Sequence, residues 1–349
     1  MKMKPALCIL VTLMALGSRD VLSVTPPLKN DFEQAKQAFE LGLKEDALSL
    51  LKRQQVDSPS AEMIDLLVRV NLSLGDRRAA LEPLLRGWEE GTDRAAKRMW
   101  ENKVRVVSRS FFTQESVQRF HGALRYMERG EWSTAAEGLA GVLKLESQNV
   151  EVIVRLAQAY WYMGHFSEAW DVLIQVESLL PIDLELQIWR ARIEMAYPEH
   201  LLTGVRRLEA IRDRKGTALS PRARSQIILW LADHYSKVSD KNSLQKLLGG
   251  PQPKWKAETP YDSSLGLLID FRRWESSLLP RWSQKWLREG ASLKLRADNL
   301  LNKLEKHPVP PFLLSGNLEL IPIPELLNYS KRIEDLLRIA ALPPKKPRQ

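Results

Sequence analysis

The residues of this chain that are most able to do chemistry are its histidines, its carboxylates and one cysteine. The five histidines are scattered along the chain: His121, His165, His200, His234 and His307. No two of them have the H-E-x-x-H spacing that places metal ligands on one helix face. The sequence also lacks the G-x-S-x-G, P-loop and dinucleotide-binding glycine patterns. The sequence therefore predicts a protein without catalytic residues, bound metal or cofactor, in which the histidines have structural or solvent-exposed roles. An enzyme with its active site in 263–349 is the least favoured alternative.

The cysteine, Cys8, lies within an apolar run from Ala6 to Leu16 that follows two lysines. A run of 11 residues is too short to cross a bilayer, which takes about 20, but it suits the core of a secretory signal peptide. We therefore predict a cleaved signal peptide over 1–23 and a periplasmic or secreted protein. A buried N-terminal helix and an uncleaved anchor are the alternatives. The mature chain would lack cysteine, which favours a bacterial periplasm because secreted eukaryotic domains often depend on disulfides.

Two stretches of the chain repeat one pattern of residue types at a spacing of 34. The recurring residues form the pairs Tyr126 and Tyr160, Gly130 and Gly164, Trp132 and Phe166, Ala135 and Ala169, and Leu139 and Leu173. The apolar residues around them follow the i, i+3, i+4 spacing of amphipathic helices. A glycine allows a tight turn between helices, and small residues allow two helices to approach closely. The pattern predicts helical hairpins that each bury their apolar face against a similar neighbour.

This period and residue content resemble the tetratricopeptide repeat, a pair of antiparallel helices that stacks into a superhelix. The stretch 150–183 fills the characteristic positions of the family and includes Pro181, which we expect to stop its second helix. A more divergent pair of repeats, with Lys44 and Arg77 in the aromatic position, precedes it. The resemblance implies an all-α fold, an α-α superhelix or TPR-like solenoid, to which the sequence adds a helical C-terminal extension.

The domain organisation follows from where this pattern begins, breaks and ends. We predict a repeat array over 28–248, with one extra helix inserted at 92–111, where the register of the glycines is interrupted. Turn-forming residues predict a linker over 249–262. A helical C-terminal region over 263–341 and a basic tail over 342–349 complete the chain.

The resemblance also implies where a partner binds, because the first helices of such repeats line the concave inner face. The positions that face this groove are occupied by Asp65, Arg69, Leu72, Phe120, Leu124, Met127, Val154, Gln158, Trp161 and Tyr162. The adjacent residues Trp161 and Tyr162 are the strongest candidates, since aromatic side chains are frequent binding hot spots. Packing against the next helix is the alternative role for them. The resemblance thus implies a non-enzymatic scaffold that holds a peptide or helix of a protein partner within a cell-envelope complex.

The C-terminal region offers an alternative function. Residues 272–306 contain nine lysines or arginines and four acidic residues, together with three tryptophans. Either the tryptophans pack the end of the array, or this stretch is a cationic element that contacts a membrane surface or an anionic wall polymer. The candidates for such contact are Trp282, Lys285, Trp286 and Arg288. Nucleic acid would also suit a chain with a net charge of +9, but the predicted export removes it from the expected partners.

Overall fold

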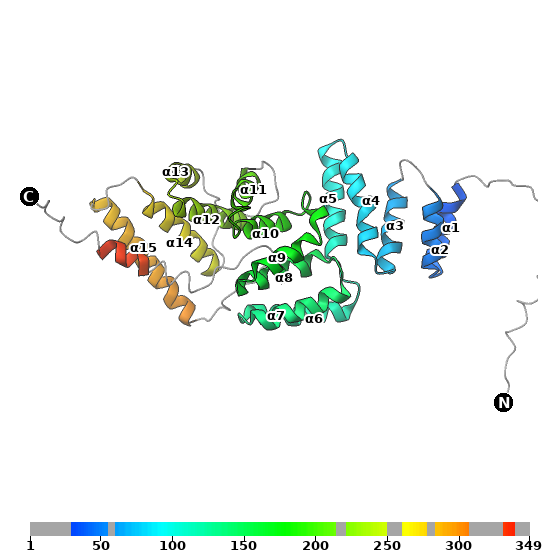
Figure 1. Cartoon of the computed structure of the whole chain (residues 1–349), viewed down its shortest axis with the longest axis horizontal. Coiled ribbons are helices and arrows are strands. Elements are labelled where there is room, and N and C mark those ends of the chain that lie inside the picture. The colour runs from blue at the N-terminus through cyan, green and yellow to red at the C-terminus, as the bar shows by residue number, and fades with distance from the viewer. Residues whose placement is uncertain are drawn as a thin grey trace, which may run out of the picture. The chain divides into compact units, whose positions relative to one another are not determined.

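The structure, a computed structural model, describes residues 29–54, 60–213, 221–249, 260–277, 283–306 and 331–338. All regular elements in these ranges are helices, and neighbouring helices pair along the chain (Figure 1). The predicted all-α helical-repeat solenoid is therefore confirmed. The chain divides into two units, the first ending at Leu74 and the second beginning at Gly75. The predicted signal peptide and basic tail lie outside the described residues.

The described residues of the first unit form three helices: α1 (Lys29–Glu40), α2 (Lys44–Arg53) and α3 (Ala61–Ser73). The helices α1 and α2 form a hairpin, and α3 packs against both. Their shared core consists of Ala35, Ala38, Ala47, Leu51, Met63, Leu66 and Val70. Lys44, which stands where the repeat family has an aromatic residue, donates a hydrogen bond of 2.9 Å from Nζ to the carbonyl oxygen of Ser73.

The second unit holds the remaining helices. They are α4 (Arg77–Glu90), α5 (Arg94–Arg109), α6 (Gln114–Glu128), α7 (Trp132–Leu145), α8 (Val150–Met163), α9 (Phe166–Ile174), the short 3₁₀ helix η1 (Glu177–Leu179), α10 (Leu184–Glu194), α11 (Leu201–Asp213), α12 (Pro221–Lys237), α13 (Lys241–Gly249), α14 (Pro260–Glu275) and α15 (Gln284–Lys306). From α6 onward they form successive antiparallel pairs, and α10 also lies against α8. Residues 331–338 are helical as well, with Ile333 buried.

The repeated glycines end the first helix of each pair in the same way. Gly130 and Gly164 have φ of +75° and +78°, a conformation that costs glycine little. The N–H of the following residue then bonds to the carbonyl five residues before it, from Glu131 to Tyr126 and from His165 to Tyr160, at 2.9 Å in both cases. This bond satisfies a carbonyl at the helix end that would otherwise have no partner. The spacing of 34 therefore repeats a backbone structure as well as a sequence.

The second helix of the best-matching repeat ends earlier than the sequence predicts. We expected Pro181 to stop it, but α9 ends at Ile174 and η1 follows. The N–H groups of Gln175 and Val176 bond to carbonyls three residues back, at 3.3 Å each. These bonds tighten the last turn before any proline is reached.

The inserted helix predicted over 92–111 is present as α5. Asp93 begins it by accepting hydrogen bonds from the N–H groups of Ala95 and Ala96 at 2.7 and 2.8 Å. Trp100 packs against Gly87 of α4 so closely that a Cβ at that glycine would lie 2.7 Å from the indole ring. Because α5 also lies against α8, the helix outside the repeat pattern becomes part of the array.

Candidate partner-binding site

The inner face of α8 is largely covered, contrary to the sequence prediction. A central helix packed on several sides is apolar over most of its surface, and α8 lies against α5, α7, α9 and α10. Val154 and Gln158 are 0% and 1% exposed, so neither side chain is available to a partner. Their assignment to an open groove is wrong in this structure. The sequence could not show this, because the burial of these side chains depends on how the neighbouring helices pack against α8.

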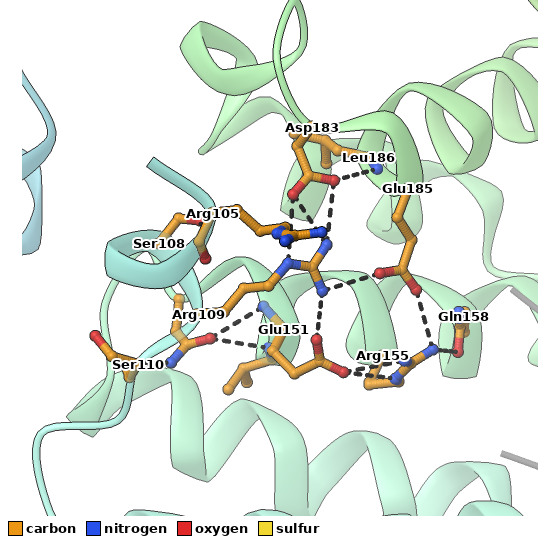
Figure 2. Close-up of polar contacts among 12 residues, drawn as sticks. Arg105, Ser108, Arg109, Ser110, Glu151, Arg155, Gln158, Asp183, Glu185 and Leu186 are labelled. Atoms are coloured by element: carbon orange, nitrogen blue, oxygen red, sulfur yellow. Dashed lines mark hydrogen bonds and ion pairs between the residues drawn. The ribbon is translucent and has the colours of Figure 1, made fainter. Parts of the chain in front are cut away.

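A cluster of charged side chains joins the end of α5 to α8 and α10. Arg109, the last residue of α5, donates to the carboxylate of Asp183 at 2.9 and 3.1 Å, and it also pairs with Glu151 and, at 2.9 Å, with Glu185 (Figure 2). Arg155 pairs with Glu151 at 3.0 Å and with Glu185 at 3.4 Å. We call these five residues the Arg109 cluster.

The local structure explains how these side chains meet. Asp183 caps α10 by accepting a hydrogen bond of 2.9 Å from the N–H of Leu186, and Asn149 caps α8 in the same way 34 residues earlier. Glu151 and Glu185 each lie two residues after these caps and are therefore equivalent in the repeat. The first turns of two successive repeats thus present carboxylates to one arginine. Sequence reasoning did not identify this cluster, although the spacing of 34 places the two glutamates at equivalent positions.

The Arg109 cluster contains three carboxylates and two guanidinium groups, so its charges do not balance when all are ionised. Burial lowers the pKa of Arg109, but the charges of Glu185, Asp183 and Glu151 outweigh burial, and the pKa is raised. For the carboxylate of Glu151, burial acts in the opposite direction and raises the pKa. The positive charges of Arg155 and Arg109 outweigh burial, and the pKa of Glu151 is lowered. For Glu185 burial dominates, and its pKa is raised despite the two arginines. Of these two glutamates, Glu185 is therefore the one whose surroundings favour the protonated form.

The open part of the inner face lies at the C-terminal end of α8. Trp161 and Tyr162 are half-buried there, and Trp161 contacts Phe166 of α9 with ring centroids 4.7 Å apart. The guanidinium carbon of Arg192 lies 4.9 Å from the ring of Trp161 and 4.9 Å from that of Trp230. An arginine of α10 is thus held over tryptophans of both α8 and α12. Such contacts orient the guanidinium group and are worth about 0.5–2 kcal/mol.

The surface continues through Tyr162, which stacks on Trp132 of α7 with centroids 4.6 Å apart and an interplanar angle of 21°. We define the Trp161 surface as Trp132, Trp161, Tyr162 and Arg192, which are half-buried, whereas Trp230 beneath Arg192 is buried. Sequence reasoning identified two of the four surface residues and missed the other two. Arg192 stands 34 residues after Gln158, which the repeat positions had selected, so the period itself was a usable signal.

The other predicted groove residues have varied surroundings. On α6, Phe120 and Met127 are 4% and 0% exposed, so their placement on an open inner face is also wrong, while Leu124 is half-buried. Phe120 fills space beside Phe111, with centroids 5.2 Å apart. Asp65, Arg69 and Leu72 belong to α3 of the first unit, where the first two are exposed and the third is half-buried.

The C-terminal tryptophans pack internally. Trp286 is 1% exposed and stacks on Trp274 with centroids 4.2 Å apart, and the indole N–H of Trp274 donates to the carbonyl of Trp286 at 2.8 Å. The prediction that Trp286 contacts a membrane or wall polymer is therefore wrong in this structure. Lys285 and Arg288 are exposed on α15, and Trp282 lies outside the described residues.

Two further properties bear on the class of protein. Within the described ranges, no group of three or more histidine, cysteine or acidic side chains is arranged to hold a metal ion. None of the helices there is both long enough and apolar enough to cross a membrane.

The similarity of this chain to known proteins is structural. No model of a known protein family and no curated protein matches the sequence. Among solved structures, the chain is similar to the crystal structure of the P58(IPK) TPR domain, with 13% sequence identity over 92% of this chain and 95% of that one. The TM-score of 0.30 is too low for any residue or partner to be transferred.

Proposed function

We propose that this protein is a non-enzymatic helical-repeat scaffold that holds a partner protein at the Trp161 surface, within a complex of the cell envelope. The observation that carries the proposal is the half-exposed group of tryptophan, tyrosine and arginine at the end of α8. These three residue types are enriched in binding hot spots because they combine a large contact area with hydrogen-bonding groups.

The packing of α8 supports this proposal. Residues 152–159 of the helix are buried without interruption, so the backbone that carries Trp161 and Tyr162 is fixed on several sides. A fixed surface loses little conformational entropy on binding, and more of the contact energy then appears as affinity. A peptide or helix that lies across the ends of α8 and α10 would contact both aromatic rings and the guanidinium of Arg192.

The test compares two tryptophans with similar surroundings. Trp161→Ala removes a half-buried ring beneath Arg192, and Trp170→Ala removes a half-buried ring beneath Arg190, whose guanidinium carbon lies 3.5 Å from it. We expect Trp161→Ala to lower capture of the native partner from a cross-linked envelope fraction by about tenfold or more, and Trp170→Ala to preserve it. Circular dichroism and thermal unfolding check that both variants fold. Equal capture by the two variants, or loss of folding in Trp161→Ala, contradicts the assignment.

The envelope location has a separate test. If the N-terminal segment is a signal peptide, intact-mass measurement of the native protein will show a chain that begins between about residues 18 and 24. An intact N-terminus on a protein recovered from the cytoplasm contradicts export. It leaves the scaffold part of the proposal standing, because the Trp161 surface does not depend on location.

A further inference from the structure

The outer face of α5 combines exposed apolar residues with arginines. Among the described helices, α5 is the one with two exposed large apolar side chains on the same face, Met99 at 42% and Val106 at 66% exposure. Asn102 lies between them, and the spacing of i, i+3 and i+7 places all three on one stripe. Arg98 and Arg105 are exposed beside this stripe. We call these five residues the α5 outer face.

The opposite side of α5 is firmly held. Trp100, Val104, Val107 and Ser108 are buried, and Arg109 is fixed in the Arg109 cluster. The helix is thus anchored at both its middle and its end, while the outer face points away from these contacts. A helix held in this way presents its side chains to a partner without the cost of ordering the backbone.

Positive charge predominates on α5. Its sequence has six basic residues, Arg94, Lys97, Arg98, Lys103, Arg105 and Arg109, and one acidic residue, Glu101. Lys97 and Lys103 lie over the rings of Trp88 and Trp100, at 5.2 and 5.1 Å. Arg105 donates to Asn102 at 3.3 Å, and within the described part of the chain no carboxylate pairs with Arg98 or Arg105. The outer face therefore presents positive charge next to two exposed apolar side chains, Met99 and Val106.

We propose that the α5 outer face is a second docking surface, which binds an amphipathic helix of a partner protein whose apolar stripe is flanked by glutamate or aspartate. Two exposed apolar side chains at helical spacing suit the apolar face of another helix, and the arginines select acidic flanks. Arginine and methionine are themselves enriched at protein interfaces. This surface is separate from the Trp161 surface, so the two proposals succeed or fail independently.

The test uses the full chain and a fluorescent peptide of about five helical turns, with leucines at i, i+3 and i+7 and glutamates on both sides. A matched peptide carries lysines in place of the glutamates. By fluorescence anisotropy at low salt we expect the glutamate peptide to bind about tenfold tighter or more, with the preference falling as salt is added.

Two variants assign the binding to α5. The double variant Met99→Ser with Val106→Ser is expected to weaken binding of the glutamate peptide about tenfold. The double variant Arg98→Glu with Arg105→Glu is expected to remove the preference for the glutamate peptide over the lysine peptide. The matched control, Leu202→Ser with Arg206→Glu, changes an exposed apolar residue and an exposed arginine of α11 and should leave binding unchanged. Trp161→Ala should also leave it unchanged.

Several results would overturn the proposal. Equal affinity for the two peptides removes the charge argument, and equal weakening by the control removes the assignment to α5. Binding of phosphatidylglycerol vesicles that depends on the arginines, but not on Met99 and Val106, identifies a membrane surface instead. A concentration-dependent dimer in sedimentation experiments that the Met99→Ser and Val106→Ser variant abolishes identifies a second copy of the chain as the occupant.

Discussion

Two buried arginines, Arg77 and Arg109, connect helices of the second unit in different ways. Arg77 lies in the first turn of α4 and pairs with Glu146 at 2.8 Å, and both side chains are fully buried. The nitrogen that pairs with Glu146, Nη2, also donates to the carbonyl of Ser110, and Nη1 donates to the carbonyl of Ser147, at 2.6 Å in both cases. Arg109 instead meets three carboxylates, and its side chain and that of Glu151 remain 19% and 23% exposed. One site is dry and balanced, and the other is partly wet and has excess negative charge.

The surroundings shift the pKa values of the two guanidinium groups in opposite directions. Burial lowers the pKa of Arg77, and the hydrogen bond and charge of Glu146 only partly oppose it. For Arg109 the carboxylates outweigh burial and the pKa is raised. A dry one-to-one pair is therefore sensitive to the loss of either partner, whereas a cluster with surplus carboxylates can respond by taking up a proton. Three sets of variants test this difference.

The largest effect is expected for Arg77→Met. The substitution leaves Glu146 buried with the N–H of Phe112, at 2.8 Å, as its remaining hydrogen-bond donor. We expect a loss of about 3–5 kcal/mol in the free energy of unfolding, measured by urea denaturation. The double variant Arg77→Met with Glu146→Met should recover a large part of it, because no unpaired charge remains. A loss below about 1 kcal/mol in the single variant contradicts the importance of this pair.

A smaller effect is expected for Arg109→Met. Three carboxylates then face Arg155 alone, but protonation and partial hydration relieve the repulsion, so we expect a loss of about 2 kcal/mol at neutral pH. The loss should diminish as the pH is lowered and the carboxylates take up protons. Urea denaturation over a pH series measures this trend. A loss that is independent of pH, or larger than that of Arg77→Met, would show that the cluster behaves like the dry pair.

The smallest effects are expected for two glutamates of the cluster, with opposite signs. The pKa of Glu185 is raised on folding, so its contribution to stability is present below the unfolded value of about 4.3 and is lost as the pH rises through the folded pKa. Glu185→Gln should therefore be as stable as the natural chain at neutral pH, or more stable by about 1 kcal/mol. This difference should shrink as the pH falls toward the unfolded value.

Glu151 is the matched control, because the two arginines lower its pKa. Its contribution is present above the unfolded pKa of about 4.3 and is lost as the pH falls through the lower folded value. Glu151→Gln should therefore be less stable than the natural chain at neutral pH, by about 1 kcal/mol. Thermal unfolding between about pH 2 and about pH 8, a range that extends below the unfolded pKa of both groups, measures both variants. If both substitutions change stability with the same sign, the two carboxylates are not distinguished by their surroundings.

The parts of the fold that were predictable are those set by local sequence. Gly130 and Gly164 marked the turns because a positive φ selects glycine, and the recurring alanines, Ala135 and Ala169, marked helix contacts and are fully buried. The inserted helix was also predictable from its own residues. Its contact with α8 was not, because no local pattern states which distant helix it covers.

The candidate site was likewise only partly predictable from local sequence. The repeat positions selected Trp161 and Tyr162, which remain partly exposed, and they also selected Val154 and Gln158, which are buried on the same helix. Repeat positions assume that the inner face of every helix is open. That assumption fails where neighbouring helices cover the inner face, as they do at Val154 and Gln158 of α8.

The sequence by itself determined the all-helical hairpins, their period and the turns between them, because these depend on side-chain size, backbone conformation and periodicity within about 34 residues. Only the tertiary structure decided which polar residues meet. Arg77 and Glu146 are 69 residues apart, and Arg109 and Asp183 are 74 apart, and the charge and burial that govern these pairs depend on packing between distant helices. The same packing decided which aromatic residues remain open to a partner, because exposure is a property of the folded neighbours rather than of the residue.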